Sequence, residues 1–293
     1  MSAPRVDAAT LRDHVQRLGE KHPPIDLASV DYTVRDPRAV RERFAGVLEY
    51  MARVEMEVER NVLELAVLLP GVSETDRRFV QDVWGPQEEH HGIVLDTLSQ
   101  HLGMPPTEAN TGGIAPRVRV LGALAHLPVV HEVIRLMYYL TGAATEKSAM
   151  LAYRAMSEGL DEMGETAVRR TVVDAVKVQE PGHFAFYRLS AQHLVESGAL
   201  APWQMHLARF LRSRTFSLVG ASTREQRTGF GAVVVELGLD AEIERNVRDI
   251  ARVESQLLWA SDQGVDVPGY ALAAFRDAAE LYRERAGRQA LAA

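Results

Sequence analysis

Apolar residues recur at three- and four-residue spacing along almost the entire chain, and this periodicity constrains the fold more than any other feature. Alternation of apolar and polar residues, which would indicate strands, is nearly absent. Short clusters rich in Gly, Pro and Ser separate the periodic segments. The pattern therefore predicts an all-α protein whose long helices each turn one apolar face toward a shared core.

Four long periodic segments come first, and Asp36 and Ser73 are typical N-caps at the start of the first two. The predicted helices span about 37–69, 73–103, 128–158 and, after the turn GLDEMG, 165–198. Weaker helical patterns follow at about 203–219, 222–237, 240–263 and 268–286. Two hairpins joined by a long crossover match the outline of a ferritin-like four-helix bundle with additional helices. We expect one domain over residues 1–293, with the core bundle at about 37–198 and accessory helices at 199–293.

Polar residues interrupt all four apolar stripes at mid-height, where a buried carboxylate needs a partner. The interrupting residues are Glu55, then Glu88 and His91, then Glu146, and finally Glu180 and His183. Spacings of 33 residues in the first hairpin and 34 in the second return the paired glutamates to similar heights. Glu followed by Glu-x-x-His, twice over, is the ligand pattern of carboxylate-bridged di-iron sites inside four helices.

Iron suits this set because four carboxylates and two imidazoles nearly balance two divalent ions and leave positions open for dioxygen. Zinc fits less naturally. We expect two iron ions, bridged by Glu88 and one other carboxylate. Glu59, one turn beyond Glu55, is an alternative ligand, although stripe position and hairpin symmetry favour Glu55. The simpler alternative is a helical protein with hydrogen-bonded core histidines.

Pro181 and Gly182 lie between two predicted ligands, Glu180 and His183. A proline inside a helix costs about 3 kcal/mol, and metal binding at a kink could offset that cost. In a second interpretation, one helix ends at Gln179 and the next has Pro181 in its first turn. Both interpretations leave the two ligands three positions apart on one helix face.

Composition excludes several classes of protein. The chain has no cysteine, so disulfides, thiolate catalysis, iron–sulfur clusters and cysteine-bound zinc are all excluded. A net charge of -7 without a long basic run disfavours nucleic acid as a partner. No apolar run reaches the roughly 20 residues of a membrane span, and the start lacks a secretory pattern. We therefore expect a cytoplasmic protein without a membrane segment.

Three segments resemble the soluble acyl-carrier-protein desaturases of plants and actinobacteria. In WGPQEEHHG, the residues Trp84, Glu88, His91 and Gly92 match the family's W-T-A-E-E-N-R-H-G motif. YYLTGAATEKSAM is similar to the family's tyrosine-containing helix that leads to Q-E-R-A-T, with Glu146 at the ligand glutamate. QEPGHFAFYR is similar to its D-E-x-x-H segment.

The resemblance covers about residues 37–195 and is weaker beyond. It implies a di-iron enzyme that desaturates a carrier-linked fatty acyl chain with dioxygen and two electrons from a donor such as ferredoxin. We also expect a homodimer. Gln179 replaces an acidic residue, Ala149 replaces a threonine, and ERNV only hints at the first-helix T-E-x-N-L-P motif. Such neighbours of the ligands tune reactivity, so desaturation and hydroxylation both remain open.

The rival enzyme is a di-iron hydroxylase or N-oxygenase acting on another small-molecule or carrier-bound substrate. N-oxygenases carry an additional histidine one turn before the last Glu-x-x-His, where this chain has Val176. Iron-storage proteins are shorter and lack accessory helices.

The acyl group could be carried by an acyl carrier protein or by coenzyme A. Because acyl carrier protein is acidic and this chain is negative overall, docking needs a local basic surface. Arg209, Arg212 and Arg214 in RFLRSR are the candidates, with an ordinary solvated face as the alternative.

Overall fold

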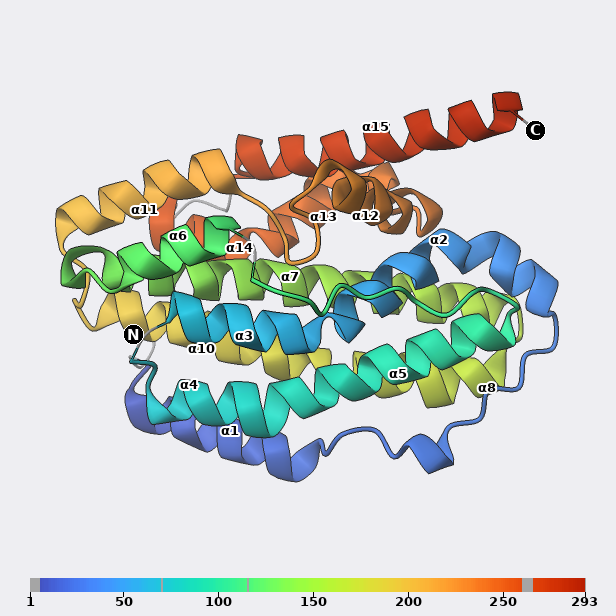
Figure 1. The fold of residues 1–293 in the computed structure, drawn as a ribbon, viewed down its shortest axis with the longest axis horizontal. Helices are drawn as coiled ribbons and strands as arrows, with labels where there is room; N and C mark the ends of the chain where they lie inside the picture. Colours follow the sequence, from blue (N-terminus) through green and yellow to red (C-terminus); the bar gives the residue numbers. More distant parts are fainter. Residues whose placement is uncertain (1–5, 70, 115, 260–265, 293) are drawn as a thin grey trace.

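The computed structural model describes residues 6–69, 71–114, 116–259 and 266–292, and these ranges contain helices but no strands (Figure 1). The all-α prediction is confirmed. Within the same ranges, no helix combines the length and the apolar character that crossing a membrane requires.

The first hairpin starts at the expected caps. The side chain of Asp36 accepts a hydrogen bond from the Ala39 backbone N–H, and that of Ser73 accepts one from Asp76. The expected second helix is present over residues 74–101 without a break, but residues 79–84 are π-helical. Such π-helical stretches are frequent at functional sites. The elements are α2 (Pro37–Met56), α3 (Val58–Leu68), α4 (Glu74–Arg78), the π-helical η2 (Phe79–Trp84) and α5 (Gly85–His101).

The expected single helix over 37–69 is wrong, because Glu57 separates α2 from α3. The Glu57 carboxylate is buried and accepts hydrogen bonds from Arg53, at 3.2 Å, and Arg60, at 2.5 Å. It also accepts one from the Asn110 backbone N–H, in the crossover between the hairpins. These partners lie up to 53 residues away, so the periodicity of the helix itself carries no sign of the break.

The second hairpin consists of α7 (Pro128–Glu162), α8 (Thr166–Val168), the π-helical η3 (Arg169–Val173), α9 (Asp174–Lys177) and α10 (Glu180–Glu196). The kinked continuous helix is therefore wrong. The preceding helix ends at Lys177 and not at Gln179, but the second interpretation is confirmed for Pro181, which lies in the first turn of α10. Proline is favourable there because its missing N–H would have no helical partner. Pro86 has the same position in α5.

Two further helices, α1 (Ala8–Lys21) and α6 (Pro116–Ala125), were not expected from the periodicity, and a short 3-10 turn, η1 (Leu27–Ser29), follows α1. The accessory region contains α11 (Pro202–Thr215), α12 (Arg224–Glu236), η4 (Leu239–Glu242), α13 (Ile243–Ile250), α14 (Arg252–Trp259) and α15 (Gly269–Ala292). In Figure 1, α15 and α12 form one side of the molecule and α1 lies on the opposite side.

Helix α2 packs along α5, and α7 packs along α10. The buried apolar residues form two clusters. Helix α7 contributes to both, and the consecutive segments α2–α3, η2–α5 and α9–α10 each pass from one cluster to the other. On the α2–α3 segment, for example, Leu48 belongs to one cluster and Val58 to the other, with Glu55 between them; on α7, Tyr139 and Leu151 flank Glu146 in the same way. The polar interruptions thus lie together between two apolar regions.

Candidate metal centre

Six carboxylate and imidazole side chains from α2, α5, α7 and α10 converge between the apolar clusters. Among the described residues they form two overlapping groups, in each of which one potential ligand atom per residue lies within 4.8 Å of the others. The groups are Glu55, Glu88, His91 and Glu180, and Glu88, Glu146, Glu180 and His183. Glu88 and Glu180 belong to both groups, so each of these two carboxylates lies close to ligand atoms of both.

Five of the six side chains are buried, with both imidazoles at 0 % exposure, whereas Glu55 is partly exposed. His183 Nδ1 lies 2.9 Å from Glu88 Oε1, and His91 Nδ1 lies 3.4 Å from Glu180 Oε1. These four atoms and Glu180 Oε2 are buried without a hydrogen bond of acceptable geometry. Buried polar atoms are rarely left without partners, so such a concentration fits a site whose partner is a cation.

Burial raises the pKa values of Glu55, Glu146 and Glu180 well above the ordinary range, and the negative charge of Glu88 raises them further. Burial also acts to raise the pKa of Glu88, but its interactions with Glu55, His183 and His91 outweigh burial and hold that pKa well below the ordinary value. Without a cation, the four carboxyl groups cannot all ionise together. Divalent cations would replace the protons that this arrangement otherwise retains.

Aromatic side chains hold two of the carboxylates. The Tyr153 hydroxyl donates to Glu55 Oε1 at 2.8 Å, and the Trp84 indole N–H donates to Glu146 Oε1 at 3.3 Å. Each donor leaves the second carboxylate oxygen available for a metal ion.

Two glutamine side chains contact the Nε2 atoms of the two histidines. Gln179 Oε1 lies 2.7 Å from His91 Nε2, and Gln87 Oε1 lies 2.5 Å from His183 Nε2. In the sequence, Gln179 stands out only as a departure from the family motif, and Gln87 is not among the predicted site residues. A signal was available, since both ligand motifs are Gln-Glu-x-x-His.

The structure places the two first-helix candidates differently. Glu55 belongs to the cluster, whereas Glu59 is exposed in the first turn of α3 and belongs to neither ligand group. The break at Glu57 lies between them. The geometry therefore favours Glu55.

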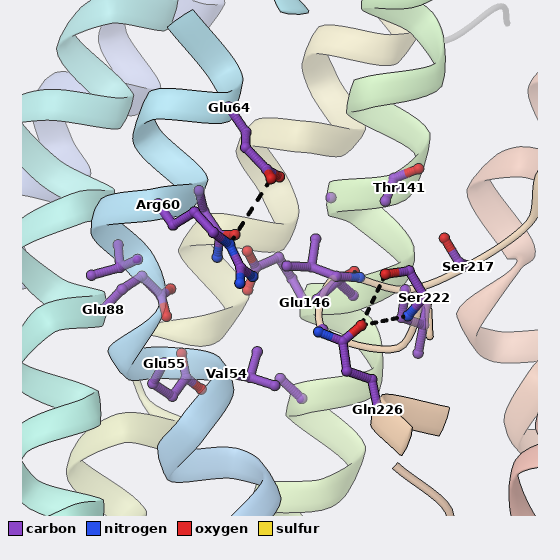
Figure 2. A pocket seen from close by; sticks show the side chains of 18 of the residues that line it. Val54, Glu55, Arg60, Glu64, Glu88, Thr141, Glu146, Ser217, Ser222 and Gln226 are labelled. Carbon is purple, nitrogen blue, oxygen red and sulfur yellow. Dashed lines mark hydrogen bonds and ion pairs between the residues drawn. The ribbon is translucent and has the colours of Figure 1, made fainter. Parts of the chain in front are cut away.

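A cavity of about 790 Å³ reaches the cluster, and Glu55, Glu88 and Glu146 form part of its wall (Figure 2). Such a volume lies in the range of small-molecule sites. Val54 and Val58 form apolar parts of its wall, and the Arg60–Glu64 ion pair forms a charged part on the side of Glu88. Figure 2 shows Ser217, Ser222 and Gln226 on the side away from Glu55 and Glu88. The cavity can therefore hold a molecule that has both apolar and polar parts.

The predicted docking arginines do not form one exposed group. Arg212 is 1 % exposed; its guanidinium pairs with Glu254 at 2.7 Å and donates to the Thr141 hydroxyl at 2.9 Å. Its assignment to a docking surface is therefore wrong, because a partner cannot reach it. Arg209 is partly buried and donates to the Leu258 carbonyl, which leaves Arg214 as the exposed member.

No protein-family profile, curated protein or solved structure matches this chain. The resemblance to the desaturases therefore rests on the motif residues themselves.

Proposed function

We propose that the protein is a ferritin-like di-iron oxidoreductase that uses dioxygen and externally supplied electrons to oxidise a substrate held in the cavity. The observation that carries this proposal is the pair of overlapping ligand groups with two shared carboxylates, Glu88 and Glu180, beside a cavity of substrate size. Glu55 and His91 would complete one iron site, and Glu146 and His183 the other.

The ligand chemistry fits iron. Four carboxylates offset the charge of two divalent ions, and a mixed oxygen and nitrogen ligand set without thiolate is the one used by such centres. When bound, the iron pair would supply the two-electron chemistry that activates dioxygen for attack on an unactivated C–H bond. The protein contributes burial, which excludes water, and fixed donors that hold the carboxylates in place.

The first candidate reaction is desaturation of a carrier-linked fatty acyl chain, with an acyl carrier protein or coenzyme A as the carrier and a ferredoxin as electron donor. The apolar wall of the cavity beside Glu55 supports it, because an alkyl chain could lie there within reach of the ligands. A cytoplasmic homodimer remains part of this proposal.

The second candidate is a di-iron hydroxylase or N-oxygenase acting on a more polar small molecule. The polar side of the cavity favours it, because Ser222 and Gln226 bond one another at 2.9 Å beside Ser217 and offer groups that an alkyl chain does not use. Burial of Arg212 also removes one of the charges assigned to carrier docking.

Incubation of iron-loaded protein with dioxygen, NADPH, ferredoxin and ferredoxin reductase would separate the candidates. Parallel reactions would contain acyl carrier protein esters, acyl-coenzyme A esters or a panel of polar amines and acids, with mass spectrometry of the products. A loss of two mass units from an acyl chain supports desaturation, and a gain of sixteen supports oxygenation. Absence of any product, with Glu146→Ala protein giving the same result as the unsubstituted protein, would contradict the proposal.

A further inference from the structure

Gln87 bridges a histidine of the cluster and the backbone at the end of α1. It is 1 % exposed, its side-chain amide donates to the His22 carbonyl, and its Oε1 faces His183 Nε2. A carbonyl oxygen can only accept a hydrogen bond, so the NH₂ of Gln87 must face His22. The amide oxygen then faces His183, and the imidazole must donate from Nε2.

Gln179 makes the same pair of contacts with the other histidine and with the next backbone carbonyl, that of Pro23. Its amide donates to the Pro23 carbonyl at 2.8 Å, and its Oε1 accepts from His91 Nε2 at 2.7 Å. The same reasoning fixes Nε2 of His91 as the donor. In the neutral form, each imidazole therefore keeps its lone pair on Nδ1, the atom that faces the carboxylates.

The segment that supplies both carbonyls is docked against the second motif. The His14 ring bonds the Gly182 carbonyl at 2.9 Å, and a Cβ atom on Gly182 would lie 2.2 Å from Leu18 Cδ1. Gly182 thus permits the close approach of α1, whereas Pro181 serves the helix start. The His90 ring also bonds the Ile25 carbonyl at 2.7 Å, which ties the segment to α5.

We propose that Gln87 and Gln179 are positioning residues that fix both imidazoles as Nε2–H tautomers, held in turn by the segment that follows α1. The N-terminal segment, residues 7–26, is then part of the metal centre and connects its two halves. This inference rests on the proposed metal centre, because it assigns a role toward the metal to groups that do not bind it.

Replacement of each glutamine by methionine tests the proposal, since methionine has a similar size and forms neither hydrogen bond. In metal-free protein at alkaline pH, ¹⁵N spectra should show the Nε2–H tautomer for both histidines, and a mixture at His183 in Gln87→Met. Affinity for Co²⁺, used as a spectroscopic probe, should fall about 10- to 100-fold, as is typical when a residue that orients a ligand is lost.

Gln204→Met is the matched control. Gln204 is also buried and also bridges two backbone groups, since it donates to the Val129 carbonyl and accepts from the Ala201 N–H. Its replacement should leave the tautomers and the Co²⁺ affinity unchanged.

Gln87→Glu provides a second variant that keeps the acceptor for His183 but sets an oxygen against the His22 carbonyl. It should keep the tautomer while amide exchange in residues 14–26 becomes faster. Unchanged tautomers and Co²⁺ affinity in the methionine variants would overturn the positioning role and leave the metal centre intact. If the unsubstituted protein binds no metal, the proposed function fails. The ¹⁵N spectra of metal-free protein would still show whether the glutamines fix the histidine tautomers.

Discussion

Glu180→Gln should have opposite effects on the metal-free and the metal-loaded protein. Glu180 is 1 % exposed, neither carboxylate oxygen has a hydrogen bond of acceptable geometry, and burial and Glu88 together raise its pKa. The Nδ1 atoms of His91, at 3.4 Å, and His183, at 3.8 Å, lie close to the Glu180 carboxyl group but form no hydrogen bond with it. Ionisation of Glu180 is therefore costly until a cation binds, and without a cation the buried group retains a proton and still has no hydrogen-bond partner.

The size of the effect follows from burial. A buried polar group without a partner costs about 1–3 kcal/mol, and a glutamine amide can donate to the neighbouring carboxylates. Metal-free Glu180→Gln protein should accordingly be more stable by about 1–3 kcal/mol, or roughly 2–4 °C in melting temperature for each kcal/mol. The variant loses a ligand shared by both ions. It should therefore lose the stabilisation of about 2.7 kcal/mol that a ligand supplies at 100 times its dissociation constant.

Thermal and urea unfolding, with and without Fe²⁺ under anaerobic conditions, would measure both effects. Glu254→Gln is the matched control, because Glu254 is equally buried but pairs with Arg212 at 2.7 Å. Its replacement leaves a buried cation unpaired and should destabilise the protein by about 3–5 kcal/mol without changing the response to iron. Destabilisation of metal-free Glu180→Gln protein, or an undiminished response to iron, would refute the reasoning.

Glu55→Ala should abolish binding of one iron, whereas Glu59→Ala should leave the iron content unchanged; metal analysis of the purified variants decides between the two residues. Pro181→Ala should lower the free energy of unfolding by about 0.4–1 kcal/mol, because the proline restricts the unfolded chain at a compatible position; urea titration would measure it, and a gain in stability would contradict the assignment. Because the pKa values of Glu55, Glu146 and Glu180 are raised on folding, metal-free protein should lose stability as the pH rises above their ordinary value of 4.5. Iron affinity should rise over the same range, since binding releases protons, and a pH series of melts with and without iron tests both trends.

The sequence carried enough information to select the converging residues because ligands of this kind break an apolar stripe. Glu55 and Glu146 are flanked by apolar core residues one turn away, so the burial of these ligands could be inferred from their neighbours. The caps at Asp36 and Ser73 were equally local signals. The sequence pattern within one helix was thus sufficient to predict its cap and the side chains that it directs into the core.

Features that depend on distant backbone atoms could not be predicted in this way. The amide of Gln179 bonds the Pro23 carbonyl, 156 residues away, and any residue at position 23 supplies a carbonyl. Arg212 looked like a surface charge because its partners, Glu254 and Thr141, lie 42 and 71 residues away. In each case the local sequence was compatible with more than one environment, and tertiary packing decided between them.

Anaerobic titration of the metal-free protein with Fe²⁺, followed by metal analysis after removal of unbound iron, tests the central claim most directly. Six inward ligands with two shared carboxylates predict about two iron ions per chain, and an absorption band of a bridged ferric pair after exposure to air. Glu146→Ala and His183→Ala should each abolish that band. Retention of one iron or none by the unsubstituted protein, or of both by either variant, would contradict the account.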